Sequence, residues 1–206
     1  MPLFYQQEID ATTKLAIWKI EEDEIFFLQK VPLKNDIAHP RKRLQHLAGR
    51  FLLPFLYPDF PNDKIMIADS KKPFLKNESY HFSISHSDDY AVAIVSRTQR
   101  VGIDVELFSD KVLRVKNKFL NEKESHFTLQ YNNDLKLLTT LWCAKEAAYK
   151  WYSYGAISLK NNISTDRFLF NQEEIIAAQL SAKENIFRLN IHYKLFSNIS
   201  MTWVIG

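Results

Sequence analysis

The chain has 206 residues, 46% hydrophobic, 25% charged and 14% aromatic, which suffices for a sizeable core and excludes a disordered chain. Its formal net charge of +3 gives no global field of the kind that marks nucleic-acid-binding proteins. Cys143 is the only cysteine, which excludes an internal disulfide and favours a reducing compartment. The N-terminal residues resemble no signal peptide, and no apolar run of about 18 residues predicts a membrane span. We therefore expect a cytoplasmic protein.

In the first half of the chain, residues 12–19 predict a strand and the acidic residues 21–24 lead into a short helix. A basic helix is expected from Pro40, because proline suits the first helical turn and apolar residues recur at helical spacing as far as Phe55. β-rich patterns then predict further strands over residues 82–85 and 90–96.

The second half continues with a strand over residues 101–106, which the turn Arg97–Arg100 can fold back on the preceding strand as a hairpin. Residues 111–131 are polar with a helical pattern, and residues 134–152 predict a stronger helix. Residues 187–195 and 200–205 predict two strands that form a hairpin around Asn198. The pattern indicates an α+β fold of antiparallel sheets with packed helices.

Two acids stand inside the strand that begins at Val101. Because side chains alternate along a strand, Ile103 and Val105 face one way, and Asp104 and Glu106 the other. Neighbouring carboxylates on a half-buried strand need a cation or basic partners, and oxygen ligands of this kind commonly hold magnesium. An edge strand with a solvated acidic face explains the pattern equally well.

The helix at 134–152 carries an apolar stripe, which should face the core; its members are Leu137, Leu141, Ala144, Ala148 and Trp151. Glu146 and Lys150 lie on another side, one turn apart. An ordinary exposed Glu–Lys pair is the simpler interpretation of these two residues. The large flanking side chains of Trp142 and Tyr149 weaken it, because aromatics usually need cover.

Basic residues are concentrated between Lys30 and Arg50, where a solvated face explains most of them. Arg41, near the N-terminus of the expected helix, is a candidate phosphate ligand because the helix dipole there favours anions. Ser85 and His86 follow a strand, but neighbours on an extended chain point apart and cannot form a catalytic pair. The sequence has no glycine-rich phosphate loop and no zinc-ligand spacing.

Several segments together resemble the 4′-phosphopantetheinyl transferases, in particular the Sfp-like (surfactin synthetase activator) branch. They are RKRLQHLAGRFLL at 41–53, KPFL at 72–75, SISHS at 83–87, GIDVE at 102–106 and WCAKEAAYK at 142–150. The last two segments carry the family signature in the expected order, with 42 residues from Asp104 to Glu146. The resemblance implies two similar α+β halves related by pseudo-twofold symmetry. Residues 1–97 would form the nucleotide side and residues 98–206 the metal and catalytic side.

The resemblance also implies the chemistry. Members transfer the phosphopantetheine arm of coenzyme A to a serine of an apo acyl or peptidyl carrier protein and release adenosine 3′,5′-bisphosphate. By similarity Mg²⁺, which also contacts the pyrophosphate, is held by Asp104, Glu106 and Glu146. The groups around coenzyme A would be Arg41 and His86 at the 3′-phosphate, Lys72, Pro73 and Ser85 along the nucleotide, and Asp104 and Lys150 at the pyrophosphate.

Transfer to the carrier serine needs a base but no nucleophile from this chain. Glu146, or a water that it orients, is the first candidate and Glu124 the second. We expect a monomer that binds neither nucleic acid nor membrane. The sequence does not distinguish Mg²⁺ from Mn²⁺ as the bound ion. Two rival interpretations are a non-catalytic coenzyme A or nucleotide-binding module and a protein that binds nucleic acid through its basic helix.

Overall fold

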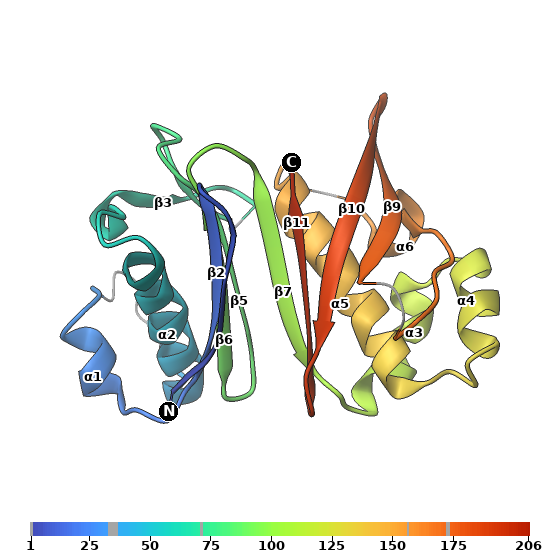
Figure 1. Ribbon diagram of the computed structural model, residues 1–206, viewed down its shortest axis with the longest axis horizontal. Helices are drawn as coiled ribbons and strands as arrows, with labels where there is room; N and C mark the ends of the chain where they lie inside the picture. The colour runs from blue at the N-terminus through green and yellow to red at the C-terminus, as the bar shows by residue number, and fades with distance from the viewer. Residues whose placement is uncertain (1, 33–36, 71, 156, 172–173) are drawn as a thin grey trace. The chain divides into compact units, whose positions relative to one another are not determined.

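The computed structural model describes residues 2–32, 37–70, 72–155, 157–171 and 174–206. Internal contacts divide the chain into two compact units, Met1–Val101 and Gly102–Gly206 (Figure 1). Each unit combines helices with antiparallel strand pairs, which confirms the predicted α+β class. The predicted boundary after residue 97 falls just before this division, and the pseudo-twofold relation stays a prediction. None of the described helices is long and apolar enough to cross a membrane.

The first unit is built on an antiparallel sheet of four strands in the order β1-β2-β6-β5. These strands are β1 Leu3–Asp10, β2 Thr13–Lys19, β5 His81–Ser87 and β6 Tyr90–Ser96. Helix α2 (Pro40–Leu56) packs on one face of this sheet, and the short α1 (Glu24–Leu28) packs on α2 (Figure 1). After the turn η1 (Asn62–Lys64), β3 (Ile65–Ile67) and β4 (Pro73–Leu75) form a separate hairpin.

Helix α2 begins at Pro40, as predicted, and runs through Pro54 to Leu56. Proline has no N–H, so the carbonyl of Arg50, one turn earlier, loses its normal helical partner. The amide Nδ2 of Asn62 donates to that carbonyl instead, at 3.3 Å. This replacement explains how the helix continues past a proline.

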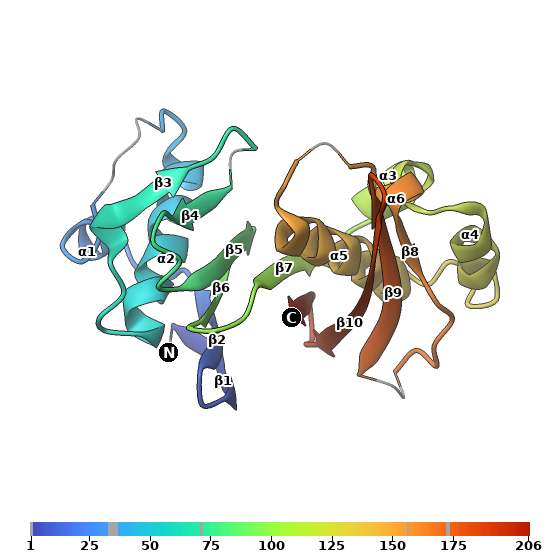
Figure 2. The same ribbon diagram turned by 90° about the horizontal axis from the view of Figure 1, so that it is seen from above.

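The second unit has a sheet of five strands in the order β7-β11-β10-β9-β8. These are β7 Val101–Leu107, β8 Ile163–Thr165, β9 Ile175–Ala182, β10 Asn185–Leu195 and β11 Ile199–Ile205. The long helix α5 (Leu135–Tyr152) packs on β11 and β10 (Figure 2). The remaining helices of this unit are α3 Lys111–Phe119, α4 Glu122–Leu129 and α6 Leu159–Asn162.

The expected hairpin between residues 90–96 and 101–106 is wrong. Strand β6 has β2 on one side and β5 on the other, so neither of its edges is open to β7. Strand β7 instead lies beside β11. The hairpin predicted around Asn198 is confirmed, since β10 and β11 pair in antiparallel register from Ile191 opposite Val204 to Leu195 opposite Ser200.

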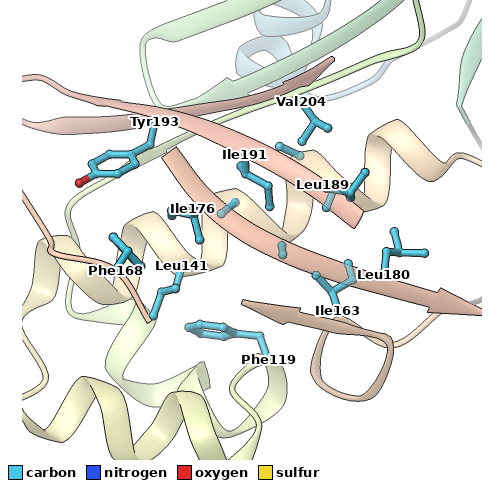
Figure 3. Packing of buried hydrophobic residues seen from close by; sticks show 14 of the residues in the cluster. Phe119, Leu141, Ile163, Phe168, Ile176, Leu180, Leu189, Ile191, Tyr193 and Val204 are labelled. Carbon is cyan, nitrogen blue, oxygen red and sulfur yellow. The ribbon is translucent and has the colours of Figure 1, made fainter. Parts of the chain in front are cut away.

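The core of the second unit joins the strands to α5 and to the end of α3. Figure 3 shows this cluster, including Phe119, Leu141, Ile163, Ile176, Leu180, Ile191 and Val204. The predicted apolar stripe of α5 is buried along its whole length, with exposed fractions between 0% and 6%. Burial of this stripe fixes which side of α5 remains for the polar residues Glu146 and Lys150.

Candidate functional site

Gly102 lets strand β7 and helix α5 approach each other closely. A Cβ atom at this position would lie 2.1 Å from the carbonyl oxygen of Ala147 and 2.6 Å from the backbone nitrogen of Trp151. No side chain larger than hydrogen fits between these backbones. The contact falls on the turn of α5 that carries Glu146 and Lys150, so it brings this turn to β7; the sequence analysis had assigned no role to Gly102.

Asp104 lies two residues further along β7 and points to the same side as Gly102. It is only 3% exposed, and the Nζ atom of Lys150 donates a hydrogen bond to its Oδ1 at 2.7 Å. A buried carboxylate is costly unless a cation compensates its charge, and Lys150 supplies that charge. Lys150 of α5 thus bonds to a residue of β7. The interpretation of Glu146 and Lys150 as an exposed pair within one helix did not include this contact.

Glu146 lies in the electrostatic field of both acids of β7. Burial, and then the nearby carboxylates of Asp104 and Glu106, raise its pKa to about 7, although Lys150 acts in the opposite direction. The indole Nε1 of Trp142 donates to Oε1 of Glu106 at 3.2 Å, which gives this aromatic the cover that its size requires. The structure therefore gathers the three acids predicted from two distant segments, together with one lysine.

Three carboxylates suit a hard divalent cation such as Mg²⁺, which prefers oxygen ligands. Burial raises the pKa of Glu146 most, the carboxylates of Asp104 and Glu106 add to this shift, and a cation would offset their repulsion. Among the described residues, however, no three acid, histidine or cysteine side chains already have the spacing of a metal site. The donor set fits a cation in chemistry and charge, and the side chains must move to surround one.

Glu124 belongs to a different cluster. It is 2% exposed, forms a capping box with Asn121 at the start of α4, and accepts from the N–H and hydroxyl of Thr165. Its Oε2 also accepts from Nζ of Lys145 at 2.6 Å. With both oxygens bonded inside the core, Glu124 has a structural role, and its predicted use as a second base stays a prediction.

Lys145 was missed by the sequence analysis. Its side chain is 0% exposed, and burial lowers its pKa although the Glu124 carboxylate opposes that shift. The signal was present in the sequence, because Lys145 follows Leu141 by four residues and thus lies beside the buried stripe of α5.

In the first unit, Arg41 is exposed and its guanidinium pairs with Asp88 and, at 3.2 Å, with Asp89. Two carboxylates therefore compensate the charge that was predicted to bind a phosphate. Both acids lie in the turn after β5, which the sequence analysis did not connect with the start of α2.

A pocket in the first unit is lined by the polar residues His46, Arg50 and Asn62 and by apolar residues of β3. Burial lowers the pKa of Arg50 to about 10, and no carboxylate pairs with its guanidinium within the described part of the chain. Burial also lowers the pKa of His46, and the charges of Arg50 and His86 lower it further. The Oδ1 atom of Asn62 is buried and has no hydrogen-bond partner among the described residues.

The other predicted nucleotide residues lie in strands β4 and β5 or, for Lys72, directly before β4. Pro73 pairs with Ile67, which lines the pocket, and the carbonyl of Lys72 accepts from the N–H of Ala68. Ser85 is buried in β5, whereas its neighbour His86 is exposed, as strand alternation predicts. His86 interacts electrostatically with His46, whereas Arg41 is paired with Asp88 and Asp89.

Comparison with known proteins gives consistent matches. Residues 100–202, half of the chain, match the family model ACPS, the 4′-phosphopantetheinyl transferase superfamily. The "4'-phosphopantetheinyl transferase gsp" of Aneurinibacillus migulanus is 29% identical over 145 residues, which cover 68% of this chain and 58% of that protein.

A second relative is the "L-aminoadipate-semialdehyde dehydrogenase-phosphopantetheinyl transferase" of Xenopus laevis. It is 28% identical over 130 residues, which cover 53% of this chain and 43% of that protein. The aligned part is thus less than two thirds of either relative. The family match contains both β7 with Asp104 and α5 with Glu146 and Lys150. The chain therefore belongs to the 4′-phosphopantetheinyl transferase superfamily.

Proposed function

We propose that the protein transfers the 4′-phosphopantetheine group of coenzyme A to a serine of an apo carrier protein, releases adenosine 3′,5′-bisphosphate, and belongs to the Sfp-like branch. The observation that carries this proposal is the cluster of Asp104, Glu106, Glu146 and Lys150 inside the segment that matches the family. Such a cluster can bind a divalent cation and a pyrophosphate.

The second unit would supply the chemistry. Asp104, Glu106 and Glu146 would hold Mg²⁺, which supplies positive charge against the negative charge that develops on the pyrophosphate. Lys150 adds a mobile ammonium beside the same phosphates. Glu146, directly or through a water that it orients, is our candidate for accepting the proton of the carrier serine.

The first unit would hold the nucleotide. We move the phosphate contact proposed for Arg41 to Arg50, assisted by His46 and His86, because Arg41 is already paired with two acids. A half-buried guanidinium without a carboxylate partner is suited to a phosphate, which it can bind through two hydrogen bonds. Lys72, Pro73 and Ser85 remain proposed contacts of the nucleotide.

Helix α3 is our proposed docking surface for the carrier protein. It begins four residues after β7 and exposes Lys111, Leu113, Arg114 and Lys118, with no acid along its length. Carrier proteins are typically acidic on the helix that they present, so a basic surface with one exposed leucine complements them in charge. This position would keep the carrier next to the strand that bears Asp104.

The experiment is to incubate the purified protein with coenzyme A, Mg²⁺ and an apo carrier protein and to measure the carrier mass. We expect the mass to increase by one phosphopantetheine, and this increase to disappear with EDTA and in Asp104→Asn. A protein that binds coenzyme A but never modifies a carrier would be the non-catalytic binding module. Transfer that persists in EDTA and in Asp104→Asn would contradict the cation site.

A further inference from the structure

The buried ammonium of Lys145 connects four parts of the second unit. Its Nζ lies 2.7 Å from the carbonyl oxygen of Phe119, 3.1 Å from that of Leu159 and 2.7 Å from that of Ile163. The fourth contact, at 2.6 Å, is with Oε2 of Glu124. These acceptors belong to the end of α3, the start of α6, the start of β8 and the first turn of α4.

The carboxylate of Glu124 extends the same network. Its Oε2 accepts from the N–H of Asn121 at 2.9 Å, and its Oε1 accepts from the N–H and hydroxyl of Thr165 at 2.8 and 3.0 Å. Both ends of the Lys145–Glu124 pair are therefore fully bonded and excluded from water. Around it, the side chains of Phe119 and Ile163 pack near Leu141 of α5 (Figure 3).

A buried ion pair is not needed for stability, because well-packed apolar residues of similar volume often stabilise a fold equally well or better. Its distinctive property is directional bonding. An apolar stripe holds a helix against a sheet but tolerates small rotations about the helix axis, whereas an ammonium whose three N–H donors are shared among four fixed acceptors does not.

We propose, on the basis of the cation site proposed above, that Lys145 and Glu124 are positioning residues that fix the rotation of α5 and thereby aim Glu146 at the acids of β7. Neighbouring residues of a helix are about 100° apart, so the direction of Lys145 determines that of Glu146. A carboxylate about 6 Å from the helix axis moves by about 2 Å when the helix turns by 20°. A shift of this size would change the distance from Glu146 to the acids of β7 and so weaken the cation site.

The test uses Mn²⁺ alone as the probe of the cation site, measured by titration calorimetry and electron paramagnetic resonance on the whole protein. The main variant is Lys145→Met combined with Glu124→Gln, which removes both charges and leaves an amide oxygen for Thr165. We expect it to be more stable to heat than Lys145→Met alone, which buries an uncompensated carboxylate. We expect its dissociation constant for Mn²⁺ to be at least tenfold higher than that of the unchanged protein.

The control is Ile176→Ala, a fully buried position of β9 whose strand partner, Ile191, bonds neither Lys145 nor Glu124; it should lower the melting temperature without changing Mn²⁺ binding. Thr165→Val is a milder second variant, because it removes only the hydroxyl that donates to Glu124. It should weaken Mn²⁺ binding severalfold, and it decides the matter if the double variant does not fold.

Unchanged Mn²⁺ binding in a folded double variant, or in Thr165→Val where the double variant does not fold, would overturn the inference and leave the proposed activity intact. An equal loss of binding in Ile176→Ala would also overturn it, since the effect would then follow from lost stability alone. If the unchanged protein binds no Mn²⁺, the cation site fails and the inference with it, whereas phosphopantetheine transfer in the mass assay is judged separately.

Discussion

Replacing Gly102 by alanine should separate β7 from α5. Ordinary contact distances begin at 3.4 Å, and the new Cβ would lie 2.1 Å from the carbonyl oxygen of Ala147, so the two backbones must move apart by about 1.3 Å. Neither neighbouring backbone can rotate away as a side chain would. We expect a loss of about 3 kcal/mol, the upper end of the usual cost of overpacking.

The same displacement should break the link between strand and helix in the candidate site. The Nζ–Oδ1 distance between Lys150 and Asp104, now 2.7 Å, would approach 4 Å, which is beyond hydrogen-bonding range. We therefore expect phosphopantetheine transfer by Gly102→Ala to fall at least tenfold even at temperatures where the variant is folded.

Urea unfolding followed by circular dichroism measures the stability of this variant, and the carrier mass assay measures its activity. A loss of about 3 kcal/mol corresponds to a melting temperature roughly 6–12 °C lower in a protein of this size. Gly49→Ala is the matched control, because its Cβ would meet only the side chain of Ile84, with Cγ2 at 2.5 Å and Cβ at 3.9 Å, rather than backbone, and a better helix former offsets part of the strain. A Gly102→Ala protein as stable as the unchanged chain, or no more affected than Gly49→Ala, would refute the close-contact argument.

Three further predictions concern charge. The Glu146 carboxyl has a higher pKa in the folded state (about 7) than its ordinary 4.5, so its protonation stabilises the fold below about pH 4.5 and this contribution is lost as the pH rises through 7. Glu146→Gln should consequently exceed the unchanged protein in stability at pH 8, by on the order of 1–3 kcal/mol, and match it at pH 4 in urea unfolding; equal stability at pH 8 would contradict the raised pKa. Arg50→Gln should raise the KM for coenzyme A at least tenfold, and Arg41→Gln less than twofold, in steady-state kinetics. The reverse order would indicate that Arg41, and not Arg50, binds the phosphate. Arg114→Glu should raise the KM for the carrier severalfold and leave the KM for coenzyme A unchanged, with a salt dependence weaker than that of the unchanged protein; an unaltered KM for the carrier would exclude α3 as the docking surface.

Local patterns in the sequence predicted much of the fold, because periodicity and capping act over a few residues. The strand with Asp104 and Glu106, the helix with Glu146 and the hairpin around Asn198 all follow from such patterns and are present in the structure. The family signature then indicated which acids should meet. Their proximity depends on Gly102, whose importance becomes visible only when the backbone of α5 is in place.

Features that depend on long-range pairing were not predictable in this way. The neighbour of β7 could not be read from the chain, because it depends on both edges of β6 being occupied by other strands. The charge of Arg41 is compensated by acids 47 and 48 residues away, and that of Lys145 by Glu124, 21 residues away. A residue's spacing indicates which side of an element it occupies, but its partner depends on the tertiary fold.

The proline within α2 links a local irregularity of the helix to the wall of the pocket in the first unit. Because Pro54 offers no N–H, the carbonyl of Arg50 takes the amide of Asn62, and the oxygen at the other end of that planar amide is left in the wall of the pocket. An alanine at position 54 would make a more regular helix and at the same time release this wall. In the pocket proposed for the nucleotide, the residue that interrupts the helix would thus also fix the position of a wall residue, so regular secondary structure and a rigid pocket wall would place opposite demands on position 54.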